Sequence, residues 1–452
     1  MPSIRHLISI DDLSLAEMLA LFERAREFAG EPKNWSHLCP GRISATLFYE
    51  ASTRTRLSFE SAMLRLGGGV ITAADMRMSS ASKGESLADT VRVVGGAYAD
   101  ILVLRHPSEG AARLAAEFSS VPVINAGDGS HEHPTQTLCD LYSLWIEHGR
   151  IEGLDVVLAG DLRYSRTIHS FAYALARFGA NIICVPQSGF EMPEYMVRRL
   201  REEFAVEPVR ANASRLGELA SASDVVYLTP QKPHQLSLFT DARGFNVERV
   251  DAVYMTRPQT ERHTAQDGQT KTDYLQLGKR AMSADSLRDA VVMHPLPRRE
   301  EISSDLDADP RSIYFKQASR GVPIRMAILG SLLGELDALS GRPAARNPVF
   351  PVQVGDNPCL NPTCIAHTED RHVTPKVELA SAFPPRVACA YCSNEIPVGA
   401  VGCSTTGHFH APSSRELRKI RPDHMVFFRD AAQAQALGFA SAARPSSVSE
   451  RS

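Results

Sequence analysis

Hydrophobic residues in this chain follow two periods. Near the start, Ser14 and Glu17 form a capping-box pattern, and the apolar positions after them recur at helical spacing, which predicts an initial helix. Farther on, short apolar runs typical of strands alternate with longer helical patterns, which predicts βαβ units and parallel sheets, an α/β fold. The expected strands are Ile43–Tyr49, Ile101–Arg105, Pro122–Ile124, Val156–Ala159, Ile182–Val185, Val225–Thr229, Ala252–Thr256 and Val291–Met293.

The segment Ser52–Arg56 reads Ser-Thr-Arg-Thr-Arg between the first expected strand and a helical pattern. Phe59, Ala62, Met63 and Leu66 recur on one face of that helix and would pack inward. The first helical turn then offers backbone N–H groups, hydroxyls and guanidiniums to one volume, which predicts a phosphate-sized anion site. The alternative is a capped helix with solvated arginines.

At 452 residues the chain has room for about three domains, taking ~150 residues per domain. Its 49 basic and 52 acidic residues leave a net charge of −3, so no overall field attracts nucleic acid or an anionic membrane. The first residues lack the apolar core of a signal peptide, and no apolar run approaches the ~20 residues of a membrane span. We therefore expect a cytoplasmic protein that binds neither nucleic acid nor membrane.

Four of the eight cysteines cluster late in the chain. Cys359 and Cys364 enclose four residues, and Cys389 and Cys392 enclose two. Two close pairs across a loop form the pattern of a tetrahedral four-cysteine zinc site without an open position. We therefore expect a structural Zn²⁺ and no organic cofactor, with free buried cysteines as the alternative.

Several motifs add a family resemblance. The segment Phe48–Glu60 resembles the carbamoyl-phosphate signature of the carbamoyltransferases, and six further motifs follow in the order of aspartate carbamoyltransferase in particular. This resemblance spans roughly residues 1–335. Asn357–His367 and Cys389–Cys392 resemble the zinc domain of the regulatory chain of the same enzyme. The six motifs are Lys83–Glu85, Arg105–Pro107, His133–Gln136, Gly160–Thr167, Met255–Arg262 and His294–Arg298.

The resemblance implies a two-lobed carbamoyltransferase fold with parallel sheets flanked by helices, plus a small C-terminal zinc-binding β-rich domain. Residues 1–133 would bind carbamoyl phosphate, with a terminal helix at about 318–340 returning to this lobe, and residues 134–317 would bind aspartate. A turn-rich linker is expected at 341–356, because that stretch is poor in apolar residues. The zinc domain would occupy 357–412, followed by an extension at 413–452.

For carbamoyl phosphate, the resemblance implies an oxyanion-stabilising set of Thr55, Arg105, His133 and Gln136. His133 and Gln136 lie three residues apart on an opening helical turn, with His toward the carbonyl oxygen and Gln toward the carbamoyl nitrogen. A structural histidine before proline is the alternative, and the leaving phosphate is the expected proton acceptor. The implied ligands are Ser52, Thr53, Arg54, Thr55, Arg105, His133, Gln136, Leu296 and Pro297, and the implied catalytic residues are Arg54, Thr55, Lys83, Arg105, His133 and Gln136.

For the second substrate, Arg166 and Arg257 can each hold a carboxylate with two parallel N–H groups, which suits a dicarboxylate. The resemblance adds Lys83 and Gln259 as aspartate contacts. Arg257 and Pro295 favour aspartate, because ornithine enzymes carry an acidic loop and a cysteine at these places.

The resemblance also implies contacts between lobes and between chains. Ser79 and Lys83 would reach the active site of the adjacent subunit, which implies a homotrimer or a dimer of trimers. Glu50 would pair with Arg166 and Arg262 across the cleft in the closed state, with a solvated glutamate as the alternative.

Two regions depart from the family pattern. Asp224–Gln231 is echoed by Asp251–Gln259, as though a strand and loop were duplicated, and Pro230–Val250 is expected to be an extra loop. After the zinc domain, Phe409–Leu417 and Val426–Phe439 faintly resemble the metal-binding module of Ada-type repair proteins, with serines at the cysteine places. We interpret this part as a packing remnant without metal, and Cys403, His408 and His410 as non-ligands.

The function predicted from the sequence is aspartate carbamoyltransferase, which forms N-carbamoyl-L-aspartate and phosphate from carbamoyl phosphate and L-aspartate in de novo pyrimidine biosynthesis. The zinc domain is expected to dock between subunits, because Val387–Gly402 carries no lysine or arginine for nucleic acid. Other pyrimidine-pathway enzymes are candidate partners. The alternatives are a carbamoyltransferase for another amino acid and a non-catalytic scaffold of that fold.

Overall fold

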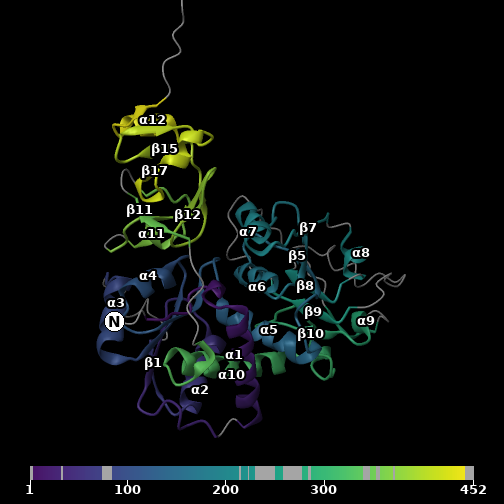
Figure 1. Cartoon of the computed structure of the whole chain (residues 1–452). Coiled ribbons are helices and arrows are strands. Elements are labelled where there is room, and N and C mark those ends of the chain that lie inside the picture. The colour runs from purple at the N-terminus through teal and green to yellow at the C-terminus, as the bar shows by residue number, and fades with distance from the viewer. Residues whose placement is uncertain are drawn as a thin grey trace, which may run out of the picture. The chain divides into compact units, whose positions relative to one another are not determined.

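The chain forms two compact units in the computed structural model (Figure 1). Unit 1 comprises Met1–Glu85, Asp89–Pro107 and Ala115–Ala344, and unit 2 comprises Ser86–Ala88, Ser108–Leu114 and Ala345–Ser452. The structure describes residues 4–31, 34–73, 84–212, 215–221, 223–229, 250–257, 277–283, 287–339, 347–352, 357–369 and 372–442.

The first sheet of unit 1 has the strand order β2-β1-β3-β4, and all its pairs are parallel. Its central strands are buried along nearly their whole length, as expected where helices cover both faces of a parallel sheet. The β2 strand lies at an edge and is only partly buried. The bounds are β1 (Ile43–Phe48), β2 (Gly69–Ala73), β3 (Ile101–His106) and β4 (Val123–Asp128).

The second sheet of unit 1 has the strand order β10-β9-β8-β5-β6-β7, again with parallel pairs only. The two echoed sequence segments form neighbouring strands, β8 and β9, in which Tyr227 lies opposite Tyr254 with ring centroids 4.2 Å apart. The expected extra loop after β8 lies outside the described residues, apart from Val250. The bounds are β5 (Asp155–Gly160), β6 (Asn181–Pro186), β7 (Val209–Arg210), β8 (Val225–Thr229), β9 (Ala252–Met255) and β10 (Val291–Met293).

Helices cover both sheets of unit 1. The α1 helix begins with the expected capping box, in which Ser14 and Glu17 bond each other's backbone N–H groups. Among the described helices, none is long and apolar enough to cross a membrane. The bounds are η1 (Ile10–Asp12), α1 (Leu15–Gly30), α2 (Thr53–Arg65), α3 (Leu87–Val93), the π-helix η4 (Val94–Tyr98), α4 (Ala111–Phe118), α5 (Pro134–His148), α6 (Arg166–Arg177), α7 (Glu194–Phe204), α8 (Leu216–Ser221), α9 (Lys279–Met282) and η11 (Ser304–Leu306).

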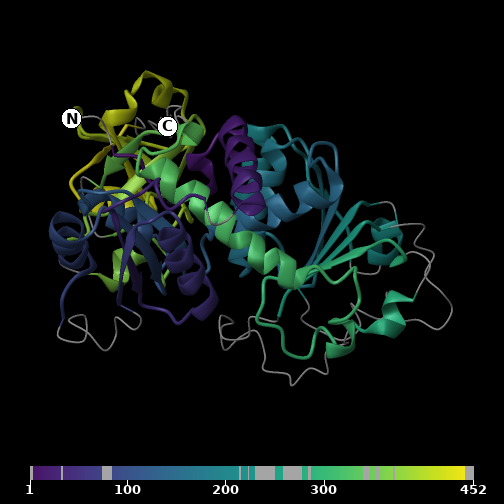
Figure 2. The same ribbon diagram turned by 90° about the horizontal axis from the view of Figure 1, so that it is seen from below.

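The long helix α10 (Tyr314–Leu332) connects the two halves of unit 1 (Figure 2). It packs against α1, α2 and α5, and Ile324 and Ile328 are fully buried in the core that these helices share. The terminal helix was expected at about 318–340, whereas the helix begins earlier and ends at Leu332, before the short turn η12 (Asp337–Leu339).

Unit 2 contains two four-stranded sheets, ordered β11-β12-β13-β14 and β17-β15-β16-β18. Two expectations need correction here. Residues Val349–Pro351 of the expected linker form strand β11, and the expected boundary at residue 412 falls inside the second sheet. The bounds are β11 (Val349–Pro351), α11 (Ile365–Thr368), β12 (Lys376–Ala382), β13 (Pro385–Cys389), β14 (Glu395–Ile396), β15 (Ala400–Cys403), β16 (His408–His410), η13 (Arg415–Lys419), η14 (Pro422–His424), β17 (Met425–Phe428), α12 (Ala431–Ala436) and β18 (Ala440–Ser441).

Within unit 2, the segment Ser108–Leu114 bonds to the cysteine-bearing loops. The backbone of Glu109 accepts from the N–H of Ile365 and donates to the carbonyl of Thr363, and its carboxylate accepts from Asn361 at 2.8 Å. Arg113 donates to the carbonyl of Ala390 at 2.8 Å. These bonds order the loops on either side of the cysteine pairs.

Candidate active site and metal site

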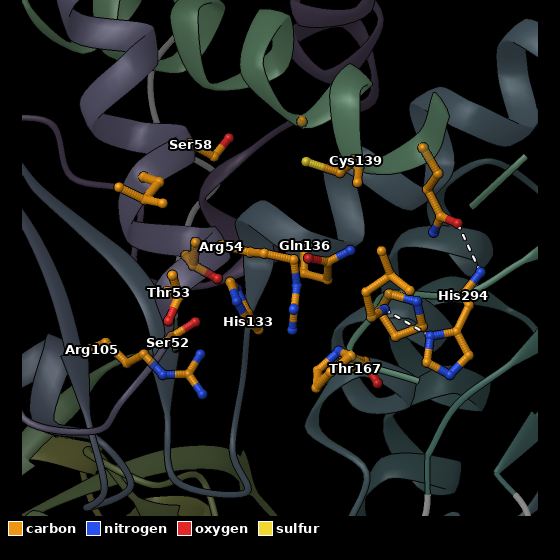
Figure 3. Close-up of a pocket in the computed structure, with 18 of the residues that line it drawn as sticks. Ser52, Thr53, Arg54, Ser58, Arg105, His133, Gln136, Cys139, Thr167 and His294 are labelled. Carbon is orange, nitrogen blue, oxygen red and sulfur yellow. Dashed lines mark hydrogen bonds between the residues drawn. The ribbon is translucent and has the colours of Figure 1, made fainter. Parts of the chain in front are cut away.

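A cavity of about 660 Å³ opens in unit 1 where the strands of both sheets end (Figure 3). Ligand pockets of this size are typical of small-molecule sites, and open parallel sheets place them beyond the carboxyl ends of their strands. The predicted residues among its lining are Glu50, Ser52, Thr53, Arg54, Thr55, Arg105, His133, Gln136, Arg166, Arg257, Leu296 and Pro297.

The first turn of α2 forms one wall of the cavity. Ser52 is the N-cap residue in an extended conformation, and its side chain makes no capping bond. Ser52 and the first residues of the helix line the cavity, so the Ser52 hydroxyl and the first backbone N–H groups of the helix are available as donors to an anion. Burial and the positive charge of Arg257 lower the pKa of Arg54. This wall of the cavity therefore carries positive charge that a bound anion would balance.

Arg105, near the end of β3, lies beside the same wall. Its guanidinium donates to the carbonyl of Ala126 at 3.2 Å and to the carboxylate of Glu50 at 3.1 Å. Burial, reinforced by the nearby Arg166, lowers the pKa of Arg105 to about 9 despite the Glu50 charge. Buried positive charges this close together favour a bound anion.

Glu50 joins two arginines from different parts of unit 1. Besides Arg105, its carboxylate lies 3.4 Å from the guanidinium of Arg166, at the start of α6. The structure thus brings Glu50 to the expected partner Arg166 and also to Arg105. Gly127 has φ +116°, and a Cβ at this position would lie 3.1 Å from the guanidinium of Arg105 and 3.2 Å from that of Arg166. Both the backbone conformation and the close approach therefore favour glycine here.

His133 and Gln136 enter the cavity from the start of α5. His133 is the N-cap residue with Pro134 in the first turn, and its backbone N–H donates to the hydroxyl of Ser170 at 3.2 Å. Its ring Nδ1 lies 3.4 Å from the hydroxyl of Thr135. Gln136, about one helical turn after His133, donates to the carboxylate of Asp140 at 2.8 Å.

The loop after β10 carries Leu296 and Pro297. Leu296 has φ +53°, a backbone conformation that a leucine rarely adopts and that costs about 1–3 kcal/mol. Its N–H donates to Nδ1 of His294 at 2.8 Å, and Nε2 of the same ring lies 2.9 Å from the carboxylate of Glu301. The buried His294 therefore carries its proton on Nε2, and burial lowers its pKa.

Four predicted residues cannot be placed. Ser79, Lys83, Gln259 and Arg262 lie outside the described residues, so the expected contacts from an adjacent subunit and part of the aspartate loop stay predictions. Arg257 is the last described residue of that loop, and it lines the cavity together with Arg166.

The cavity is also lined by residues that the sequence does not predict as part of the site. His294 lies in the motif His294–Arg298, but spacing along the sequence does not reveal its bond to the N–H of Leu296. Gln317 comes from α10, far along the chain, so no local signal reveals it. Others of this kind in the lining are Ser58, Cys139, Thr167, Thr256 and Arg325.

In unit 2, the thiols of Cys359, Cys364, Cys389 and Cys392 are buried and lie within 4.8 Å of one another. The Sγ atoms of Cys359 and Cys392 are 3.6 Å apart, and those of Cys364 and Cys389 are 3.8 Å apart. A tetrahedral zinc with 2.3 Å bonds needs sulfur atoms about 3.8 Å apart, so these four residues fit the metal.

The extension after the zinc cluster shows no second cluster of metal-binding side chains in its described part. Cys403 bonds to the hydroxyl of Thr405 at 3.0 Å, and Ser414 caps η13 through the N–H of Glu416. An apolar cluster that includes Phe409 and Phe428 holds this sheet against α12.

Two parallel sheets and an arginine-lined pocket at their strand ends are the features of a two-lobed α/β enzyme with a site suited to anions. Family models described as the carbamoyl-P binding domain and the Asp/Orn binding domain of aspartate/ornithine carbamoyltransferase match residues 5–145 and 229–332. The model of the aspartate carbamoyltransferase regulatory chain, metal binding domain, matches residues 358–399.

Individual relatives agree with these models. The aspartate carbamoyltransferase catalytic subunit of Clostridium kluyveri is 42% identical over 334 residues, which cover 73% of this chain and 98% of that protein. The catalytic subunit of Methanocaldococcus jannaschii aspartate transcarbamoylase superposes with a TM-score of 0.60 at 41% identity, covering 74% of this chain and 99% of that one. The Trypanosoma cruzi enzyme, solved with carbamoyl aspartate and phosphate, gives 0.58 at 34% identity, over 73% and 96%. The chain belongs to the aspartate carbamoyltransferase family, with a regulatory-chain metal-binding domain in the same polypeptide.

Proposed function

We propose that this protein transfers the carbamoyl group of carbamoyl phosphate to L-aspartate, giving N-carbamoyl-L-aspartate and phosphate, an early step of de novo pyrimidine biosynthesis. The observation that carries the proposal is the convergence of Arg54, Arg105, Arg166 and Arg257 on one cavity, where burial lowers the pKa of Arg54 and Arg105. Such a cavity suits a phosphate and a dicarboxylate together. The T. cruzi relative, which binds the corresponding products, supports this assignment.

The phosphate would bind at the first turn of α2. Ser52, Thr53 and Thr55 line the cavity with hydroxyls, the backbone N–H groups of the turn add donors, and Arg54 adds a charged one. Arg105 would hold both a phosphate oxygen and the carbonyl oxygen, with Glu50 giving up its bond as the substrate enters. Exchange of one carboxylate for a more highly charged anion strengthens the charge-assisted bonds.

The acyl group would lie between α5 and the loop after β10. Thr55, Arg105 and His133 would stabilise the oxygen of the tetrahedral intermediate, whose negative charge develops in a largely water-free pocket. Gln136 and the backbone carbonyls of Leu296 and Pro297 would accept from the carbamoyl nitrogen. The attacking amine loses its proton to the departing phosphate, so no side chain has to act as the base.

L-Aspartate would bind with one carboxylate on Arg166 and the other on Arg257. Each guanidinium can offer two parallel N–H groups to a carboxylate, so the two together recognise a dicarboxylate. Lys83 and Gln259 are proposed as further contacts, with Ser79 and Lys83 contributed by the adjacent subunit of a trimer. Glu50 and Arg262 are proposed to hold the closed state.

The four cysteines of unit 2 are proposed to bind a structural Zn²⁺, because their sulfur spacing matches tetrahedral coordination. When bound, the metal would join the loops that carry the two cysteine pairs and stabilise unit 2. We infer that this unit docks between chains of a cytoplasmic oligomer, a trimer or a dimer of trimers. Association with other pyrimidine enzymes is a further proposal of the same kind.

The direct test is phosphate release from carbamoyl phosphate by the purified protein with aspartate, with ornithine and with no acceptor. The proposal predicts rapid release with aspartate, coupled one to one with N-carbamoyl-aspartate, and background release in the other two reactions. Equal release with all three would show hydrolysis and reject carbamoyl transfer. Release with ornithine alone would reassign the acceptor.

A further inference from the structure

Behind the cavity, a fully buried carboxylate receives three hydrogen bonds. Asp140, on α5 one turn after Gln136, is 1% exposed. Its Oδ1 accepts from the side-chain amides of Gln136 and Gln317, each at 2.8 Å, and its Oδ2 accepts from the hydroxyl of Tyr254 at 2.7 Å. The three donors come from α5, α10 and β9, so this single side chain joins both halves of unit 1.

The carboxylate determines which end of the Gln136 amide faces the substrate. Burial raises the pKa of Asp140 to about 6, opposed by its hydrogen bonds and by Arg325, so the group is ionised at neutral pH. An ionised carboxylate only accepts hydrogen bonds. The amide nitrogen of Gln136 must therefore face Asp140, and the amide oxygen is turned to the other side, where Gln136 lines the cavity (Figure 3).

The neighbouring glutamine is fixed in the same way. Gln317 donates to Asp140 through its nitrogen and accepts from the backbone N–H of His294 at 2.9 Å through its oxygen. His294 in turn holds the N–H of Leu296. Since both ends of the Gln317 amide are committed, a flip of this amide would lose its bond to Asp140 and its bond from the His294 N–H together.

We propose that Asp140 is a positioning residue that makes the enzyme select a carbamoyl over an acetyl donor. With its oxygen toward the acyl group, Gln136 accepts from the –NH₂ of carbamoyl phosphate, whereas the –CH₃ of acetyl phosphate leaves that buried oxygen unpaired. A site built to bond an N–H group discriminates strongly against an analogue that lacks it. This inference rests on the proposed function and adds to it the origin of donor specificity.

The test compares kcat/KM for carbamoyl phosphate with that for acetyl phosphate, both with aspartate, in the full-length enzyme. Where acetyl phosphate is not turned over, its inhibition constant against carbamoyl phosphate replaces the second value. Asp140→Ala should lower the ratio by about tenfold or more, the equivalent of one lost hydrogen bond. Asp140→Asn, which preserves volume and gives a weaker neutral acceptor, should lower it less but in the same direction.

Three further variants separate an effect on positioning from an effect on stability. Tyr254→Phe removes another bond to the same carboxylate but leaves the contact to Gln136, so it should keep the ratio. Gln136→Leu removes the amide itself, and adding Asp140→Asn to it should cause no further fall in the ratio, because Asp140 acts through Gln136.

The outcomes are distinct. If Asp140→Ala does not fold, the Asn variant decides alone. An unchanged ratio in a folded Asp140 variant, or a further fall in the double variant, would overturn the inference and leave Asp140 a structural group. Failure of the unmodified enzyme to use carbamoyl phosphate with aspartate would instead refute the proposed function.

Discussion

The two units of this chain achieve order by different means. In unit 1, the side chains between the two sheets and α10 form extensive apolar cores in which nearly every member is buried. In unit 2, the described apolar clusters are small, one built around Phe409 and Phe428 and one around Leu417. Apolar clusters this small contribute little burial energy, so a metal bound by the four cysteines would add substantially to the stability of unit 2.

The difference between the two units bears on which of them can hold a catalytic site. Unit 1 can hold Arg54 and Arg105 in a setting whose burial lowers the pKa of both, because its large apolar cores supply the stability that offsets this cost. Unit 2 holds its four thiols in a closed set that leaves no position for substrate. We therefore expect catalysis and metal binding to respond to separate perturbations.

The largest effect should follow loss of the metal site. Cys389→Ser removes one thiolate ligand, and because metal binding supplies ~10 kcal/mol or more of folding free energy in small zinc modules, unit 2 should unfold. Sedimentation should then show a particle smaller than the unmodified protein, with less than one zinc per chain. Cys403→Ser, a cysteine outside the cluster, is the matched control and should change neither value. Full assembly mass without zinc would contradict the proposed docking role.

The next effect concerns the cavity. Arg105→Ala removes the guanidinium proposed for both the phosphate and the oxyanion, so kcat should fall by ~10²-fold or more, the scale of one lost oxyanion donor. Steady-state kinetics and thermal unfolding check this together. Arg24→Ala, an exposed arginine on α1, should leave kcat unchanged. Near-normal turnover by folded Arg105→Ala would reject the site.

A smaller effect tests whether sites are shared. Lys83→Ala and Arg54→Ala chains should each be inactive alone. In an equal mixture that re-forms trimers, about a quarter of the sites should combine an intact Arg54 with an intact Lys83 of the neighbour, if Lys83 acts across the interface. Recovered phosphate release of that order supports shared sites. Mixed trimers without activity would show that Lys83 does not complete a neighbour's site.

The smallest effect concerns the N-terminus of α1, which does not line the cavity. Ser14→Ala removes the cap of α1 and should cost about 1 kcal/mol, seen as a melting temperature lower by a few degrees with kcat unchanged. Glu27→Ala, which removes only an exposed ion pair on the same helix, should cost close to nothing. Equal losses in the two variants would mean that the cap contributes nothing specific.

Much of the fold could be predicted, because its strands are buried on both faces and read as continuous apolar runs. All eight expected strands are present. Within unit 1, the strands that the sequence does not predict are β2, an edge strand that is only partly buried, and β7, which has two residues. In unit 2, the sequence predicts a linker where β11 lies, because the pairing of β11 with β12 joins residues more than twenty positions apart.

The cavity shows a similar limit. Arg105 lies near the end of a strand and Arg54 just after one, both within recognisable motifs, so their place at the strand ends was predictable. The network around Asp140 was not, because Gln136, Tyr254 and Gln317 meet only after three separate elements have packed together. Sequence spacing reveals the groups that face the substrate but not the buried groups that orient them.

We expect the cavity of unit 1 to carry out carbamoyl transfer without help from the metal of unit 2. The most direct measurement is kcat per chain for carbamoyl phosphate with aspartate, followed while a chelator removes the metal and the metal content is measured in the same samples. We expect kcat to stay within a few-fold of its starting value after the metal has gone, even as the assembly becomes smaller. A kcat that falls in proportion to metal content would contradict it.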